Sequence, residues 1–404
     1  MHSIVHHDNP ALSAHGDLVE SRAPGIILAL LACLPIAGTL LIAQVLPQME
    51  EAFTGTADLR LKVSIALTVP ALAIAVSSGC VGWLADRMGK RRLLLVALFF
   101  YAIFGLSPLI LKSLEAIIAV RSGMGLAEGV IITCSTALIG DLYTQGRREG
   151  LLSLQTACAS IAAVAFAMIG GALGELGWRA PFMVYGLSLL FVPAVFYFIP
   201  NVEIERRVRA LCVAPLPWRR LLIVCVTTVI FSLCFYVAQI QTPYLLNAIG
   251  KVSPATVGLV SAITNSAVVA GSFCFVLIRR WPLSSISLVC FTLIAVGLGL
   301  AAYAKTYPGL VLGLVMASFA GGIALPNLVT GAMALLTPEQ RGLGAGLWQS
   351  SFWSGQFFSP VLVICVTAVL GGLTHAVGAF SFIALVVGGS LSLLIGSKFP
   401  KSLR

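Results

Sequence analysis

The chain has 404 residues, of which 59% are hydrophobic and only 10% are charged. A soluble domain carries about 25% charged residues, so this composition excludes a water-soluble fold and indicates a protein that lies in a lipid bilayer. The formal net charge of +10 requires no nucleic-acid partner, because the positions of the cations in the loops account for it, as shown below.

Twelve runs of about 20 mostly apolar residues follow one another along the chain, each long enough for a membrane helix. They must be helices, because lipid offers no partner to an unpaired backbone group. Their expected positions are 25–47, 63–85, 92–112, 114–140, 150–174, 180–200, 219–243, 255–278, 284–304, 309–335, 342–370 and 375–397. We therefore predict an all-α membrane protein with twelve transmembrane helices.

Lysine and arginine are distributed unevenly between the two sides of these spans. If the polar residues 1–24 form a cytoplasmic tail, 18 of the 25 Lys and Arg residues lie on the cytoplasmic side and six outside. Positive residues favour the cytoplasmic side, and the leader lacks the pattern of a cleavable signal peptide. The sequence thus predicts a monomeric, multi-pass protein of a bacterial inner membrane, with both termini cytoplasmic.

The two halves of the chain are related by a weak internal repeat. A shift of 192 residues places Gly79 on Gly271, Arg87 on Arg279 and Gly129 on Gly321. The repeat predicts two six-helix bundles, at 25–200 and 219–397, with a cytoplasmic linker at 201–218 and a cytoplasmic tail at 398–404. Bundles repeated in this way carry a substrate site between them, near the midplane of the membrane.

The most charged stretch, GWLADRMGKRR, lies between the second and third predicted spans. It resembles the loop signature of the major facilitator superfamily. This resemblance implies that superfamily's fold, transport by alternating access, and a gate formed by Gly82, Asp86, Arg87, Gly89, Lys90 and Arg91. The alternative is an orientation signal alone. In the second half Asp86 is matched by Ile278 and Lys90 by Pro282, which makes the expected gate asymmetric.

The fourth span contains two ionisable residues, Arg121 and Glu128, in the stretch RSGMGLAEG. Such groups are costly inside a membrane and are functional by default. They share a helix face and lie about 10 Å apart along its axis, too far for a direct bond. The stretch resembles an Arg- and Gly-containing motif of the superfamily's proton-linked exporters, which implies a functional Arg121, and a carboxyl group near the middle of the membrane could carry a proton. We therefore predict that Arg121 and Glu128 take part in proton coupling, with substrate contact as another role for Glu128. The alternative is that fixed partners neutralise them and they brace the bundle.

Two stretches depart from the pattern of these exporters. The fifth span keeps Gly170 and Gly171 but lacks the Gly-Pro that family antiporters usually carry before them. The first span has Gln44 where many proton-linked drug exporters carry an acid. The expected function is therefore proton-coupled efflux of a small organic solute, with import of a small metabolite by proton symport or uniport as the alternative.

Polar and aromatic side chains within the spans are candidates for substrate contacts. In the eleventh span Gln349, Trp353 and Gln356 share one face. Bundle packing is the usual role of such an aromatic stripe, but amides beside aromatic rings suit a neutral, amphipathic or aromatic solute. The candidates are Gln44, Gln155, Tyr236, Gln239, Gln241, Asn265, Asn327, Trp348, Gln349, Phe352, Trp353 and Gln356.

Other chemistries have no motif in the sequence. The ten cysteines form no CxxC pair, no Walker A sequence is present, and no paired catalytic groups appear. We therefore expect no metal, no cofactor and no enzyme activity. The expected partners are a small organic solute, protons and the lipid bilayer.

Overall fold

The computed structural model describes residues 23–200, 216–337 and 340–398, and within these ranges its regular elements are helices without strands. Twelve helical stretches in the described ranges are long and apolar enough to cross a membrane, which confirms the predicted spans to within a few residues. They are Ala23–Ala43, Leu59–Gly82, Lys90–Leu109, Leu114–Leu142, Gly146–Gly174, Ala180–Phe198, Trp218–Ile249, Pro254–Ile278, Leu283–Tyr303, Tyr307–Ala334, Leu343–Leu370 and Leu373–Ser397.

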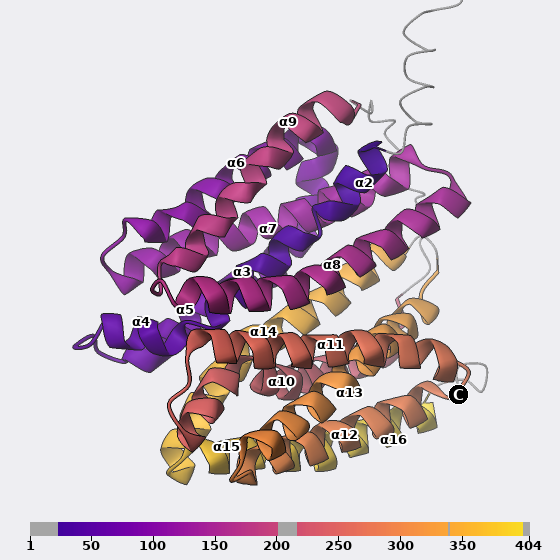
Figure 1. Ribbon diagram of the computed structural model, residues 1–404. Helices are drawn as coiled ribbons and strands as arrows, with labels where there is room; N and C mark the ends of the chain where they lie inside the picture. The colour runs from indigo at the N-terminus through magenta and orange to yellow at the C-terminus, as the bar shows by residue number, and fades with distance from the viewer. Residues whose placement is uncertain (1–22, 201–215, 338–339, 399–404) are drawn as a thin grey trace, which may run out of the picture.

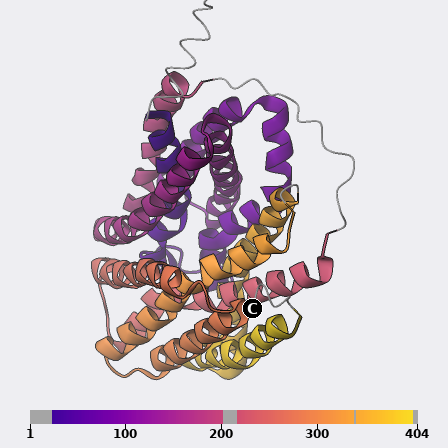
Figure 2. The same ribbon diagram turned by 90° about the vertical axis from the view of Figure 1, so that its right-hand side faces the viewer.

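The helices fall into two groups in chain order, which Figures 1 and 2 show as an indigo-to-magenta half and a red-to-yellow half. The first half contains α2 (Ala23–Leu30), α3 (Cys33–Ala43), α4 (Leu46–Ala52), α5 (Leu59–Met88), α6 (Lys90–Leu106), η1 (Ser107–Leu109), α7 (Leu114–Leu142), α8 (Gln145–Gly174), η2 (Ala180–Leu187) and α9 (Ser188–Phe198). The second contains α10 (Trp218–Ile249), α11 (Pro254–Ile278), α12 (Leu283–Tyr303), α13 (Tyr307–Ala334), α14 (Arg341–Leu370), α15 (Leu373–Ile383), η3 (Ala384–Gly388) and α16 (Gly389–Lys398).

Within each half, glycines allow helices to approach closely. A Cβ at Gly125 of α7 would lie 2.5 Å from the carbonyl oxygen of Pro70 on α5, and one at Gly297 of α12 would lie 2.6 Å from that of Gly313 on α13. Small residues take this role in membranes because lipid gives apolar side chains no reason to associate, so close backbone packing holds the helices together. Of the predicted tails and linker, residues 1–22, 201–215 and 399–404 lie outside the described residues.

The first span differs from the single helix predicted over 25–47, because it is divided into α2, α3 and α4. Pro35 lacks the N–H that would bond to Leu31, and there the backbone closes a tighter turn from Leu34 N to Leu31 O at 3.2 Å. Pro47 has the same effect near Gln44 and Val45, where the second break falls. The sixth and twelfth spans also contain non-α turns, η2 and η3.

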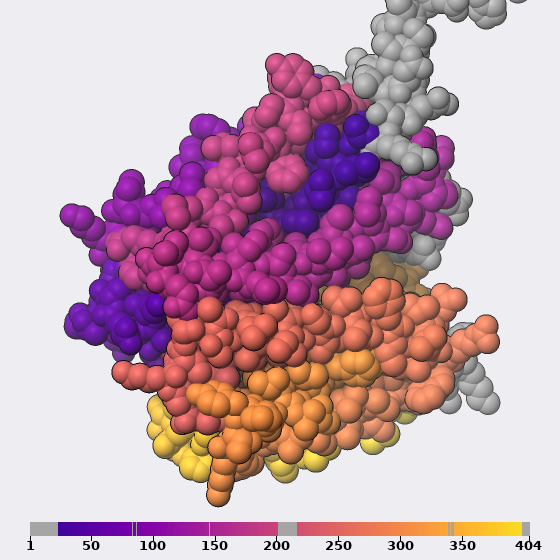
Figure 3. Space-filling view, viewed as in Figure 1, coloured from indigo at the N-terminus to yellow at the C-terminus, as the bar shows by residue number. Residues whose placement is uncertain are grey.

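The halves meet along two helix pairs, α8 with α11 and α5 with α14. We call the end of the molecule that carries Gly82–Arg92 the basic face, and the opposite end the far face. Figure 3 shows the surface of α8 lying along that of α11. Near the far face, a Cβ at Gly171 would lie 2.9 Å from Gly258 Cα. Toward the basic face, Cβ atoms at Gly146 and Gly150 of α8 would meet nothing within 4 Å.

Candidate functional site

Glu128 lies on α7, inside the first half, with 2% of its surface exposed. Its Oε1 atom is buried and has no hydrogen-bond partner. The carboxyl group packs against Gly38 of α3, in the space that a side chain at position 38 would occupy. A buried carboxyl group that lacks a fixed partner for Oε1 is costly to keep ionised, so it is suited to binding and releasing a proton.

Arg121 lies two turns earlier on α7 and is 1% exposed. Its guanidinium donates to backbone carbonyls of two other helices: Nε to Ala66 O at 2.5 Å, Nη2 to Gly38 O at 2.6 Å and Nη2 to Leu67 O at 3.3 Å. In the described part of the chain, no carboxylate forms an ion pair with Arg121. The Arg121 guanidinium therefore links α7 to α3 and α5, and it forms no salt bridge with Glu128.

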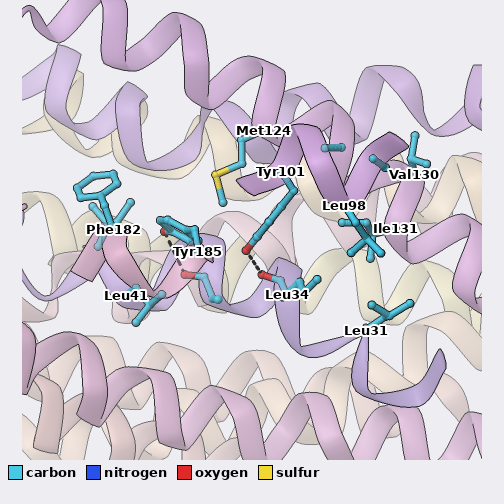
Figure 4. Packing of buried hydrophobic residues seen from close by; sticks show 14 of the residues in the cluster. Leu31, Leu34, Leu41, Leu98, Tyr101, Met124, Val130, Ile131, Phe182 and Tyr185 are labelled. Carbon is cyan, nitrogen blue, oxygen red and sulfur yellow. Dashed lines mark hydrogen bonds between the residues drawn. The ribbon is translucent and has the colours of Figure 1, made fainter. Parts of the chain in front are cut away.

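Two buried tyrosines complete this cluster on α3. Tyr101 of α6 donates to Leu34 O at 2.7 Å, and Tyr185 of η2 contacts Gly38 O at 3.2 Å. Figure 4 shows both rings directed at the same segment, with the bond from Tyr101 to Leu34 drawn. The carbonyls of α3 are thus held by side chains from three surrounding elements, α6, α7 and η2.

Side-chain hydrogen bonds join α3 and α5 of the first half to α11 and α14 of the second. Gln356 Nε2 of α14 donates to Thr39 Oγ1 at 3.1 Å, and Ser261 of α11 donates to Gln44 Oε1 at 3.0 Å. Ser350 of α14 donates to the backbone oxygen of Ala75 on α5 at 2.7 Å, beside Ser78. The predicted residues Gln44 and Gln356 therefore both lie between the halves, where α3 meets the second half.

The aromatic residues of the eleventh span form a continuous group with α10. Trp348 stacks on Phe352 with ring centroids 5.9 Å apart, and Phe352 in turn contacts Tyr236 and Trp353. The indole nitrogens of both tryptophans are buried without a hydrogen-bond partner, as is Gln356 Oε1. Unpaired buried donors and acceptors cost about 1–3 kcal/mol each, so a solute that supplied their partners would gain that energy.

Most of the other predicted amides form hydrogen bonds to residues of their own half. Gln155 bonds to Ser135 and Thr136 of α7, Gln239 to Ser318 of α13, and Asn265 to the carbonyl of Ser261 in its own helix. Asn327 donates to Ser287 Oγ at 3.0 Å and so binds α13 to α12. Gln241 is buried and Gln349 is half-buried. The structure thus does not gather the predicted amides into one cluster.

The predicted gate lies at the basic face, where Lys90 and Arg91 bond within the first half. Lys90 forms an ion pair with Asp141 at the end of α7. Arg91 donates to the carbonyl of Phe196 on α9, and its guanidinium lies 5.3 Å from that ring. Gly89 has φ of 88°, which joins α5 to α6 and favours glycine. Gly82 and the exposed Arg87 lie on α5, and the side chain of Asp86 lies outside what the structure describes.

At the far face, a second set of contacts joins the halves. Tyr244 of α10 donates to Glu50 Oε1 of α4 at 2.6 Å, and the guanidinium carbon of Arg60 on α5 lies 4.7 Å from the centroid of the Tyr244 ring. Glu175 accepts from the backbone N–H of Ala255 at 3.0 Å. Sequence reasoning missed these residues and also Gly38, Thr39, Tyr101 and Tyr185. For the residues that meet on α3, the Pro35 and Pro47 pattern was an available signal, because it marks a broken helix.

Two six-helix halves in contact, the first of which encloses a buried acid, define the fold class of a secondary transporter. The sequence profile of the Major Facilitator Superfamily matches residues 27–246, and the chain belongs to this family. The protein is therefore a multi-pass membrane transporter.

Curated relatives and solved structures agree with this family. A multidrug efflux protein, YfmO of Bacillus subtilis, is 25% identical over 41% of this chain and 42% of its own length. A chloramphenicol resistance protein of Pseudomonas aeruginosa is 27% identical over 47% of this chain and 44% of its own length. The chain thus spans less than half of either relative. A solved D-xylose–proton symporter shares the fold with a TM-score of 0.74, at 16% identity over 94% of this chain and 98% of the symporter.

Proposed function

We propose that the chain exports small organic solutes in exchange for protons, with Glu128 as the proton-binding group. The observation that carries this proposal is the buried Glu128 carboxyl group, whose Oε1 has no partner while Arg121 binds backbone carbonyls instead. Burial without an ion pair favours the protonated form of a carboxyl group, whereas a salt bridge would hold it ionised, so this group can carry a proton. The efflux activity in the name of one curated relative, the multidrug efflux protein of Bacillus subtilis, supports export.

Import of a small metabolite is the second candidate function. Its support is the fold that the chain shares with a D-xylose–proton symporter. In either case the solute would bind between the halves, against Tyr236, Trp348, Phe352, Trp353 and Gln356. The stacked rings would contact a planar or amphipathic solute, and the unpaired indole N–H groups would donate to its oxygen or nitrogen acceptors.

Alternating access would then exchange contacts at the two faces. The contacts of Tyr244 and Gly171 support a conformation that is closed at the far face. Lys90 and Arg91 bind partners in their own half here, and they would contact the second half when the basic face closes. We place the basic face in the cytoplasm of a bacterial cell, with a monomer in the inner membrane, because most Lys and Arg residues lie on that side.

The test uses purified protein in liposomes with an imposed pH gradient, an internal pH dye and a panel of organic solutes. We expect a solute to dissipate the gradient by moving opposite to protons, and Glu128→Gln to abolish this exchange. Glu149→Gln is the matched control, because Glu149 is an exposed acid at the start of α8. Movement of solute and protons in the same direction would show import, and normal exchange by Glu128→Gln would remove Glu128 from the mechanism.

A further inference from the structure

The short helix α3 contacts both halves of the molecule although it belongs to the first. It is separated from α2 and α4 by breaks near Pro35 and Pro47. A helix segment without continuous backbone bonds to its neighbours can shift or rotate at less cost than the middle of an unbroken span. This freedom distinguishes α3 from the uninterrupted helix α7 that carries Glu128.

On one side, α3 contacts the proposed proton-binding group through Gly38. The Glu128 carboxyl group occupies the place of a side chain at this position, and the Gly38 carbonyl accepts from Arg121 Nη2 at 2.6 Å. Gly38 is therefore the residue that Arg121 and Glu128 both touch. The titratable and charged groups facing Glu128 are Arg121 of α7, Tyr101 of α6 and Tyr185 of η2.

On its other side, α3 bonds to the second half. Thr39, the next residue, accepts from Gln356 at 3.1 Å, and Gln44 at the end of α3 accepts from Ser261 at 3.0 Å. Gln356 is 1% exposed and its Oε1 has no partner, so Thr39 provides its one hydrogen bond in the structure. Movement of α3 by a fraction of a hydrogen-bond length would alter this contact directly.

We propose that α3 couples the proton to the movement of the halves, with Gly38 as the positioning residue for Glu128 and with Thr39 and Gln356 as the link to the second half. This inference rests on the proposed function, in which Glu128 binds the proton. Both side chains contact Gly38, so the charge of an ionised Glu128 carboxylate attracts the Arg121 guanidinium and weakens its bond to the Gly38 carbonyl. A neutral carboxyl group leaves Arg121 on Gly38. Binding or release of a proton would thus change the strength of the hydrogen bond from Arg121 of α7 to Gly38 of α3.

The first test replaces Gly38 with alanine. The added methyl group displaces the Glu128 carboxyl group, and we expect coupled flux to fall about ten-fold, a typical size for lost coupling between sites. A shorter acid withdraws from the methyl group, so the double variant Gly38→Ala/Glu128→Asp should recover part of the flux that Gly38→Ala loses. The matched control is Gly79→Ala, because a Cβ at Gly79 of α5 meets nothing within 4 Å.

The second test removes the link to the second half by Thr39→Val, which preserves the shape of the side chain. Spin labels on the two halves report the distance between them as the pH changes. We expect the wild-type chain to change this distance with pH and the variant to lose most of that change while remaining folded. Thr292→Val is the control, because Thr292 of α12 is exposed and bonds to a carbonyl of its own helix.

The outcomes separate this inference from the proposed function. Loss of coupling in Glu128→Gln together with a normal pH response in both Gly38→Ala and Thr39→Val would overturn the role of α3 and leave proton exchange by Glu128 intact. Normal proton–solute exchange by Glu128→Gln would instead overturn the proposed function. If Gly38→Ala does not fold, the pH response of Thr39→Val decides the inference by itself.

Discussion

Tyr244 and Glu50 join the two halves of the transporter at the far face, with the phenol donating to the carboxylate over 2.6 Å. Arg60 lies against the same ring, so a residue of the second half sits between an acid and a base of the first. Replacement by Tyr244→Phe keeps the ring and removes the hydrogen bond, which is worth about 1.5–3 kcal/mol when one partner is charged. We expect the equilibrium to shift about ten-fold toward opening at the far face.

This shift is measured with a single cysteine placed at the far-face end of α10 in a cysteine-free background, by its rate of thiol labelling. Tyr303→Phe is the control, because Tyr303 is an exposed tyrosine at the end of α12. Equal labelling rates in Tyr244→Phe and in the parent would show that this bond does not hold the far face closed.

Arg121 is expected to contribute strongly to stability, because its guanidinium serves carbonyl groups on two neighbouring helices. Arg121→Lys keeps the charge but loses the planar fork, and we expect it to destabilise the protein by about 2 kcal/mol, with Arg121→Ala costing more. Thermal unfolding in detergent measures both variants against Arg280→Ala, a change at an exposed site. Unchanged melting of Arg121→Ala would contradict the bracing role.

Close backbone contact between α8 and α11 predicts a steric effect at Gly171. A Cβ there would lie 2.6 Å from Pro254 O and 2.9 Å from Gly258 Cα, so Gly171→Ala should destabilise the closed far face by about 1–3 kcal/mol. The same far-face labelling measures this change as a faster rate. Gly146→Ala, where a Cβ meets nothing within 4 Å, is the matched control and should leave labelling unchanged.

The unpaired indole of Trp353 predicts a contact with the solute. Trp353→Phe keeps an aromatic ring but removes the buried Nε1 donor. Loss of one hydrogen bond to a solute costs about 1 kcal/mol, so we expect KM to rise about five-fold while proton coupling is retained. Flux measured over a range of solute concentrations gives both parameters. An unchanged KM would assign Trp353 to packing against Phe352.

The sequence alone determined the membrane class, the twelve spans and the two residues of α7 that the membrane makes costly. These features are local, because hydrophobic length decides a span and an acid within a span is visible in the sequence. The stacking of Trp348 on Phe352 was also readable, since residues four apart share a helix face. The same local reasoning predicted one helix for the first span, whereas the structure divides it into α2, α3 and α4 near Pro35 and Pro47.

Tertiary structure alone decided which residues meet across helices. The donors of Arg121 bond to carbonyl groups of α3 and α5, and these acceptors carry no sequence signal because every residue has a carbonyl. Asn327 and Gln239 looked equivalent to Gln356 in the sequence, yet they bond inside the second half while Gln356 reaches Thr39. Helix rotation and packing set these choices, because residue type specifies what a side chain can bond to and the fold specifies what lies within its reach.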